Sequence, residues 1–562
     1  MAERTLFARK STGLVREIGL TVAIIVPLAN AIGVGWQVRV FQGMGYYPVA
    51  RSNWFLGIAP VTMAFLVTGI GCLLSVYAFA ILTAAMPRSG GGYVAISRIL
   101  SPLWGVVATL FQWMGVSTAY GQITFYCILP FMLYGGYMGL VLPAFLTSPI
   151  GVFVLGLVVI AIFSGVAALG ARQTGRLLQV IFWIPVAILI LVLFLFLVAS
   201  PSEMAAGTQE LFGASPTAYI QQALDTGLAE GAGGYWAAVV GCIIVTYWAF
   251  IGYATTNFIA GEMKEAARNL PKAMLIATGA ISVLYFIQST LLVRAGGIAG
   301  VVQGFDLVGS TAWMVYGGGS FGNLASIGPW MPIFAHIQGV GMGIGTLTAW
   351  ATLVFAILWA ANDIPPFILA TSRMVFAMAF DRVLPEWLAD VDERWHSPVN
   401  AIIATSVVAV IGAAAEGGLF SEAGIYLGDT FKVFIEGFGF RGTNLWDAIF
   451  YVSFAIACIV FPLRRPDIFE RAPFRHSKTV VMVIGVLASL AQLFFIYSFV
   501  FTPRGGYYLP GLIREFTFSG SMVWLATIAI AGVGAGFYYY YRSQAAVTGV
   551  DYTTIFAEIP PE

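Results

Sequence analysis

Long apolar runs constrain this sequence more than any other feature, because each run can cross a lipid bilayer as a helix. Such a crossing takes roughly 20 apolar residues. Inside lipid, backbone groups must be satisfied within the segment, so helices are the expected elements. The runs cover about residues 18–37, 55–83, 103–128, 150–169, 176–199, 235–260, 273–295, 344–372, 398–415, 446–463, 479–501 and 518–541. The sequence therefore predicts an all-α polytopic membrane protein with about twelve spans.

Composition supports helices and argues against several classes of partner and site. Only 9% of the 562 residues are charged, against about 25% in soluble proteins. A β-barrel would show short alternating segments instead of long runs. The net charge of +1 argues against a nucleic-acid partner. The four cysteines lie inside apolar runs and the three histidines are scattered, so we predict no metal site, no catalytic residues and no enzyme activity.

The distribution of Lys and Arg predicts the orientation of the spans. These residues concentrate in the cytoplasmic segments of membrane proteins. With the N-terminus in the cytoplasm, 20 of the 27 Lys and Arg residues fall on the inner side. An even number of spans then places both termini in the cytoplasm, and we expect a multi-pass protein of the plasma membrane.

Two of the runs carry residues that interrupt a helix. The first run holds Asn-Ala-Ile-Gly-Val-Gly at 30–35, and the sixth holds Trp-Ala-Phe-Ile-Gly-Tyr at 248–253. Glycine weakens a helix, and broken backbone persists in a membrane only where it lines a cavity or is buried in protein. Paired breaks of this kind indicate the binding site of a transporter. The alternative is that these glycines only let neighbouring helices pack closely.

The two breaks are five spans apart, so their segments cross the membrane in opposite directions. This offset predicts an inverted repeat of spans one to five and six to ten. The expected segments are a cytoplasmic N-terminus (1–17), a first repeat (18–199), an extracellular loop (200–234), a second repeat (235–463) with a long outer loop (296–343), two peripheral spans (464–541) and a cytoplasmic tail (542–562). The two outer loops could hold short interfacial helices, since residues 218–229 have some amphipathic character, but we favour ordinary ordered loops. We expect the tail after Arg542 to be mobile.

Four segments resemble the amino acid–polyamine–organocation (APC) permease family. They are residues 16–20 with 30–35, residues 86–94 with 97–98 and 102–105, residues 248–264 with 268–273, and residues 372–385 with 397–400. Their order and spacing also match, and together they cover the first ten spans. The resemblance implies a LeuT-like fold, with a 5+5 inverted-repeat core plus two peripheral helices, and transport of an amino acid or related amine by alternating access. The long outer loops depart from the family's compact pattern.

The breaks predict where a substrate binds. Free N–H groups at a helix N-terminus favour a carboxylate, and free C=O groups at a helix C-terminus favour an ammonium group. The candidate site residues at the breaks are Ile32, Gly33, Val34, Gly35, Trp248, Ala249, Phe250, Ile251 and Gly252. The resemblance implies that an aromatic side chain at the second break covers the substrate. Thr118 and Gln122 of the third span are polar enough to contact it, although for each residue alone a hydrogen bond between helices is the favoured explanation.

Asp363 is the lone acidic residue that the predicted spans place deep inside the membrane. It precedes Ser372-Arg373, at the cytoplasmic end of its span, by nine residues, or about 14 Å of helix. Such a carboxylate could carry a proton, help to ligate Na⁺ or pair with a cationic substrate. Alternatively, it could satisfy backbone groups freed by Pro365 and Pro366. No cofactor is expected, and the sequence leaves open Na⁺ coupling, H⁺ coupling and exchange without either ion.

Charged residues at the cytoplasmic ends of the spans form a candidate gate. They are Arg88, Glu262 with Lys264, and Arg373 with Asp381. For each residue taken separately, we favour a role in membrane orientation and lipid anchoring over a gate.

The sequence and the resemblance together predict a secondary active amino acid transporter. A neutral, apolar amino acid is the first substrate class, because the predicted pocket lacks basic residues. A cationic amino acid or polyamine paired with Asp363 is the second. A channel and a non-transporting amino acid sensor are the alternatives. The expected partners are a small amino acid or amine and the lipid bilayer, and the sequence predicts no oligomeric state.

Overall fold

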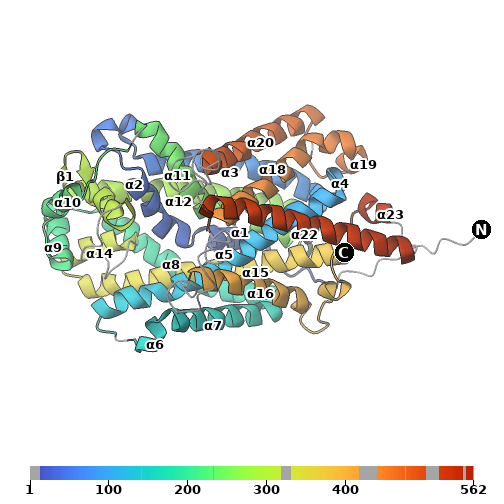
Figure 1. Ribbon diagram of the computed structural model, residues 1–562, viewed down its shortest axis with the longest axis horizontal. Helices are drawn as coiled ribbons and strands as arrows, with labels where there is room; N and C mark the ends of the chain where they lie inside the picture. Colours follow the sequence, from blue (N-terminus) through green and yellow to red (C-terminus); the bar gives the residue numbers. More distant parts are fainter. Residues whose placement is uncertain are drawn as a thin grey trace, which may run out of the picture.

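The computed structural model describes residues 13–560, except for 141, 232, 318–330, 417–439, 475, 502–517 and 549–551. Long helices run along the longest axis of the molecule as one bundle (Figure 1). Ten of the described helices are long and apolar enough to cross a membrane. The predicted class, an all-α polytopic membrane protein, is confirmed. The predicted N-terminal segment 1–17 is described only from residue 13.

The long elements follow the predicted runs in order. They are α1 (Leu20–Ala31), α2 (Val40–Tyr46), α3 (Pro60–Ala85), α5 (Pro102–Tyr137), α7 (Pro149–Ala168), α8 (Ala171–Leu197), α11 (Gly234–Phe250), α12 (Ala266–Ala299), α15 (Gly345–Phe380), α16 (Val399–Glu416), α18 (Phe440–Arg464), α20 (Lys478–Phe501) and α22 (Phe518–Thr548). The short elements are α4 (Gly92–Ile99), α6 (Ala144–Thr147), α9 (Pro201–Phe212), α10 (Pro216–Asp225), β1 (Val301–Val302), β2 (Phe305–Asp306), α13 (Leu307–Ala312), α14 (Pro332–Gly341), α19 (Pro466–Phe469) and α23 (Tyr552–Ala557).

Two predicted spans are not among the ten long apolar helices. The run 103–128 lies in α5, which is 36 residues long but carries several amides, hydroxyls and glycines in its middle. The run 235–260 begins with α11, which ends at Phe250 and is followed by short 3₁₀ turns. Both segments pass through the bundle. The count of twelve spans and the two-fold relation between 18–199 and 235–463 stay predictions.

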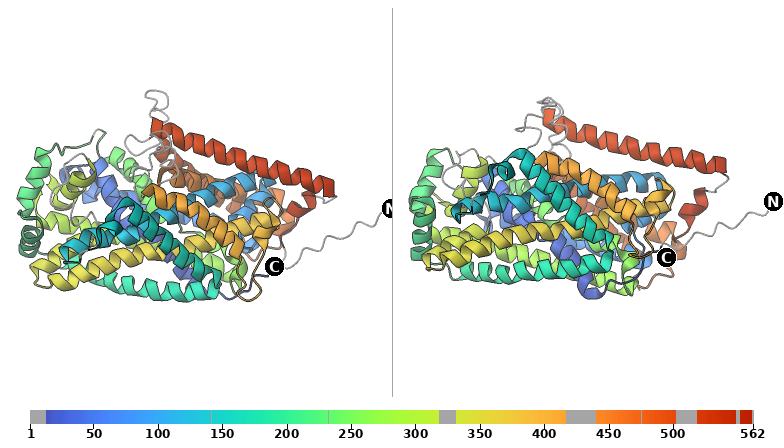
Figure 2. Two further views of the ribbon diagram at one scale, coloured as in Figure 1. Left: turned by 60° about the horizontal axis from the view of Figure 1, so that its bottom comes forward. Right: turned by 90° about the horizontal axis from the view of Figure 1, so that it is seen from below.

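The outer helices of the bundle present apolar side chains on their exposed faces. Val154, Val158 and Ile162 follow one face of α7 at helical spacing, and all three are more than 40% exposed. Similar residues are exposed on α8, α12, α20 and α22, and Figure 2 shows α22 lying along the outside of the bundle. Rows of this length in a soluble protein would be an aggregation hazard. They therefore mark the surface that contacts lipid.

One end of the bundle is covered by the helices of the two predicted outer loops, and we call it the cap end. Both loops were expected to be ordinary loops, but they fold into α9, α10, α13 and α14 around a β1–β2 hairpin (Figure 1). Gln338 joins the two loops, because its Nε2 donates to Glu203 Oε2 at 2.5 Å. Arg51 Nη1 donates to Asp306 Oδ2 at 2.6 Å and ties the second loop to the segment after α2. The first and last described residues lie at the opposite end, the terminal end (Figure 1).

Candidate functional site

The first predicted break is a real interruption between α1 and α2. The helix α1 ends at Ala31, and a single π-helical turn over Gly35–Arg39 starts the next helix. Gln37 Nε2 donates to Gly33 O at 2.8 Å and satisfies one carbonyl freed by the break. The two glycines let other helices approach closely. A methyl group on Gly33 would overlap the carboxylate of Asp363, and one on Gly35 would lie 2.6 Å from Ala249 Cα.

The second predicted break is equally real. The helix α11 ends at Phe250, and the chain continues through Gly252 into the 3₁₀ turns η4 (Thr255–Phe258) and η5 (Ala260–Glu262). Gly252 has φ = +102°, a conformation that side chains with a Cβ disfavour. A Cβ here would also lie 2.5 Å from Asn30 Cγ. The two breaks therefore lie against each other.

Two polar side chains connect the breaks, and the sequence analysis did not select either. The Tyr285 hydroxyl, on α12, donates to Ala31 O at 2.5 Å and lies 2.8 Å from Ala249 O. Asn30 Nδ2 donates to Asp363 O at 3.2 Å, and its Oδ1 accepts from the Thr255 hydroxyl. The sequence signal that could have identified Tyr285 was a tyrosine in the middle of the apolar seventh run. These contacts satisfy backbone groups that a broken helix would otherwise leave unpaired in a membrane.

A small cavity lies where the breaks meet α5 and α15. Its lining residues are Asn30, Ala31, Gly35, Ala119, Ile123, Trp248, Ile251, Asp363 and Phe367. Of the predicted site residues, Gly35, Trp248, Ile251 and Asp363 line this cavity. Five others lie at the breaks beside the cavity: Ile32, Gly33, Val34, Ala249 and Gly252. The Phe250 ring packs edge-on against Tyr285, with 5.1 Å between the ring centroids.

The two residues predicted from α5 are not among those that line the cavity. Thr118 and Gln122 are buried but do not line the cavity, and Ala119 and Ile123 do. The Thr118 hydroxyl donates to Met114 O and Gly115 O on its own helix. Successive helix residues point about 100° apart, so an error of one position turns the face of the helix away from the site.

Asp363 contacts the first break directly. Its side chain is 4% exposed, and Oδ2 accepts a long hydrogen bond of 3.4 Å from the Val34 amide. Oδ1 has no hydrogen-bond partner among the described residues. None of the residues that line the cavity is Lys, Arg or His. A carboxyl oxygen at a buried cavity without a cationic partner can receive a proton, a metal cation or an ammonium group.

The prediction that Asp363 is the lone acidic residue deep inside a span is wrong. Asp447 on α18 is only 1% exposed. The sequence analysis began this span at residue 446, so Asp447 fell at its edge and was not considered. The helix begins at Phe440 instead, which places Asp447 two turns inside it.

The terminal end is closed by two buried ion pairs. The Arg373 guanidinium donates to both carboxylate oxygens of Glu262, at 2.6 and 2.9 Å, and the two side chains are 0% and 2% exposed. Arg98 donates to both oxygens of Asp381, with side chains 0% and 1% exposed. The sequence analysis grouped Arg373 with Asp381 and Glu262 with Lys264. The structure instead pairs Arg373 with Glu262, and it pairs Asp381 with Arg98, which the analysis did not select.

The end of the chain packs onto this cluster. Tyr552, Ile555 and Phe556 of α23 are buried, and the Phe556 ring lies 5.2 Å from the Arg98 guanidinium. Arg88 Nε donates to Pro560 O at 2.6 Å, and Arg98 Nε lies 3.4 Å from Glu558 O. The tail was expected to be mobile, but its described part is anchored through these contacts.

Comparison with known proteins identifies the family. The family model described as amino acid permease matches residues 21–514. An uncharacterized transporter of Mycobacterium tuberculosis is 25% identical over 71% of this chain and 74% of its own length. A methylthioribose transporter of Bacillus subtilis is 22% identical over 91% of this chain and 92% of its own. A mitochondrial cationic amino acid transporter of Arabidopsis thaliana is 25% identical over 70% of this chain and 57% of its own. The chain is a membrane transporter that belongs to the amino acid permease family, within the APC superfamily.

Proposed function

We propose that this transporter carries a neutral, apolar amino acid by secondary active transport, with alternating access to the cavity between the two breaks. The observation that carries the proposal is this cavity, which two interrupted helices border and which apolar side chains mostly line. The absence of Lys, Arg and His from its lining disfavours an acidic substrate.

The proposed site recognises the two charged ends of an amino acid through different groups. The substrate carboxylate would contact amide groups where the second part of the broken first span begins, because helix N-termini favour anions. The substrate ammonium would contact the side of the cavity that carries Asp363 and Asn30. Ile123, Ile251 and Phe367 would then contact an apolar side chain.

A cationic amino acid or a polyamine is the second candidate substrate. Asp363 Oδ1 has no partner among the described residues, so it could accept a hydrogen bond from a cationic side chain. One relative is named as a cationic amino acid transporter, and this supports the second candidate without deciding between the two.

We further propose that the terminal end faces the cytoplasm and that the protein resides in the plasma membrane. This orientation places most Lys and Arg residues on the inner side, as the positive-inside rule requires. The buried ion pairs then form the inner gate, and the cap lies outside the cell.

Uptake into proteoliposomes tests the proposed function. Labelled neutral, cationic and acidic amino acids would be offered under a pH gradient, a Na⁺ gradient or neither. Accumulation of neutral amino acids under one gradient would support the proposal and name the coupling ion. Uptake only into preloaded vesicles would indicate an exchanger, and ungated flux down any gradient would indicate a channel. Binding without flux would favour a sensor and contradict the proposal.

Asp363→Asn is expected to remove coupling or cation recognition. The amide cannot release a proton and does not attract a cation as a carboxylate does. We expect gradient-driven accumulation to fall at least about tenfold, which corresponds to about 1.4 kcal/mol. The measurement is the accumulation ratio of the labelled substrate in proteoliposomes.

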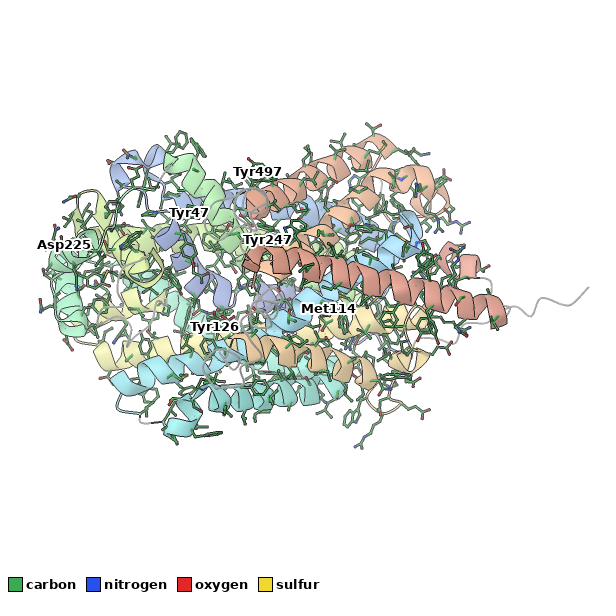
Figure 3. The ribbon with its side chains drawn as sticks, in the orientation of Figure 1. Tyr47, Met114, Tyr126, Asp225, Tyr247 and Tyr497 are labelled. Atoms are coloured by element: carbon green, nitrogen blue, oxygen red, sulfur yellow. The ribbon has the colours of Figure 1, made fainter. Side chains whose placement is uncertain are left out.

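Asp225→Asn is the matched control for this change. Asp225 lies on α10 in the cap, far from the breaks (Figure 3), and its accumulation ratio should equal that of the unmodified protein. Normal gradient-driven uptake by Asp363→Asn would assign Asp363 a purely structural role.

A further inference from the structure

Asp447 is a second buried carboxylate that lies away from the cavity at Asp363. Each of its oxygens accepts one hydrogen bond from a neutral side chain. Oδ1 accepts from Gln112 Nε2 on α5 at 2.7 Å, and Oδ2 accepts from the Tyr247 hydroxyl on α11 at 2.7 Å. Figure 3 shows Tyr247 near the middle of the bundle. The carboxyl group is therefore held between helices of the transporter, in its interior.

No basic group faces Asp447 from the described part of the chain. The titratable groups around it are Cys72 on α3, Tyr247 on α11, Tyr253 beyond the break and Tyr451 on α18 itself. From α5 and α20 the side chains that face this region are the amides Gln112 and Gln492. The charged groups of α4 and α19 are engaged at the terminal end, where Arg98 pairs with Asp381 and Asp467 with Arg465.

On α18 itself, Arg464 follows Asp447 by 17 residues and Arg441 precedes it by six, which is roughly 25 Å and 9 Å along the helix. Six residues at about 100° each also turn Arg441 to a different face of the helix. On α22 the contact near this level is Thr527 with Trp446. An ionised carboxylate in such surroundings is costly without a cationic partner. The surroundings of Asp447 therefore favour binding of a proton.

Tyr247 gives the network two hydrogen-bonding arrangements. Its hydroxyl lies 2.7 Å from Asp447 Oδ2 and 3.3 Å from Gln492 Oε1, but it carries one proton. With Asp447 ionised, Tyr247 donates to the carboxylate, and Gln492 Oε1 loses its donor. With Asp447 protonated, the acid donates to the Tyr247 oxygen, and Tyr247 donates to Gln492 Oε1. Binding of one proton thus reverses the hydrogen bond between Asp447 and Tyr247.

The same network spans the break after α11. Gln492 Nε2 donates to Ser75 Oγ at 2.8 Å and to the Tyr253 hydroxyl at 3.2 Å. Tyr247 precedes the break and Tyr253 follows its first residues, so Gln492 contacts both sides of it. Trp248, the neighbour of Tyr247, lines the cavity. A change in the direction of these hydrogen bonds therefore changes the contacts of the segment that borders the cavity.

We propose that Asp447 binds and releases a proton during transport. The resulting change in hydrogen bonding reaches the break after α11 through Tyr247 and Gln492. The proton is taken from water and returned to water, so Asp447 alternates between carboxylic acid and carboxylate, and no other bond changes. The proposal rests on the proposed transport function, and the site is separate from Asp363.

Infrared difference spectroscopy on the purified protein tests proton binding without any substrate. Spectra would be compared between about pH 5 and about pH 9, a range that brackets the values of perturbed carboxyl groups. We expect a carboxylic acid band that disappears as the pH rises, and that is missing from Asp447→Asn but present in Asp363→Asn. A pH-dependent spectrum that is the same in Asp447→Asn and in the unmodified protein would overturn the proposal.

Exchange of labelled substrate at equal pH on both sides tests the transmission. We expect the exchange rate of the unmodified protein to vary with pH, and that of Asp447→Asn to vary by no more than about twofold. Tyr247→Phe should keep the infrared band of Asp447 and lose the pH dependence of exchange, because it cuts the link to Gln492. Tyr451→Phe is the control, since the Tyr451 hydroxyl has no hydrogen-bond partner among the described residues, and it should retain both properties.

The two measurements separate failure of this inference from failure of the proposed function. If both Asp447→Asn and Tyr247→Phe keep the pH dependence of exchange seen in the unmodified protein, the proposed link from Asp447 to the α11 break is wrong. The proposed transport function would still stand. Absence of exchange for every amino acid, with the Asp447 band still present, would overturn the proposed function and the role of the proton in transport, while proton binding at Asp447 stands. If Asp447→Asn does not fold, Tyr247→Phe with its Tyr451→Phe control still decides the transmission.

Discussion

Gly252→Ala is expected to abolish substrate binding. Gly252 has φ = +102°, and its Cβ would lie 2.5 Å from Asn30 Cγ. Asn30 would have to move, although it lines the cavity and bonds to Asp363 and Thr255. Backbone strain and overpacking cost about 1–3 kcal/mol each. We expect affinity to fall at least about a hundredfold, or about 2.8 kcal/mol, as measured by equilibrium binding of the labelled substrate.

Gly279→Ala is the matched control for this substitution. Gly279 lies in α12, and a Cβ there would meet nothing within 4 Å, so binding should be unchanged. A thermal unfolding curve in detergent for both variants separates lost binding from lost folding. A Gly252→Ala protein that binds with normal affinity would show that the breaks do not form the substrate site. Gly33→Leu, which would drive a side chain into the Asp363 carboxylate, tests the first break in the same way.

Arg373→Ala is expected to cause the largest loss of stability. Arg373 and Glu262 are 0% and 2% exposed and share two hydrogen bonds. Removing the guanidinium leaves the Glu262 carboxylate buried without its partner, which costs about 3–5 kcal/mol. The pair also holds α15 against η5 at the terminal end, so its loss should favour opening there. Thermal unfolding in detergent measures the effect on stability.

Arg268→Ala is the control for Arg373→Ala, because it removes an arginine from an exposed ion pair. Arg268 lies 3.7 Å from Glu265, and both side chains are about 70% exposed, so the unfolding curve should barely change. The double variant Arg373→Met with Glu262→Gln should recover much of the lost stability, because it removes both buried charges together. If Arg373→Ala unfolds at the same temperature as Arg268→Ala, the buried pair does not stabilise the closed end.

The features that the sequence predicted well are those that depend on a single segment. Helices follow from uninterrupted apolar runs, and the breaks follow from glycines whose effect is local, as at Gly33 and Gly252. The membrane class and the family followed from the same runs and motifs. These signals do not depend on how one helix faces another.

The features that the sequence missed depend on how segments meet. Thr118 was selected because it is polar, but its hydroxyl bonds to its own helix, and the neighbouring Ala119 lines the cavity. Asp447 was overlooked because the apolar run begins later than the helix does. The cap helices were weighed only as an alternative to ordinary loops, because their stability comes from packing on each other and not from an apolar run. The partners of the buried arginines required knowledge of which helices cross at the terminal end.

The burial of all four cysteines makes the chain suited to site-specific labelling. A thiol reagent should leave Cys72, Cys127, Cys242 and Cys458 largely unreacted, so one cysteine introduced at the exposed Ala557 would carry a fluorophore with little background. Because the preceding residue, Phe556, packs against Arg98, the dye would report each time the closed end of the bundle loosens. Single transporters could then be followed through the cycle by light alone.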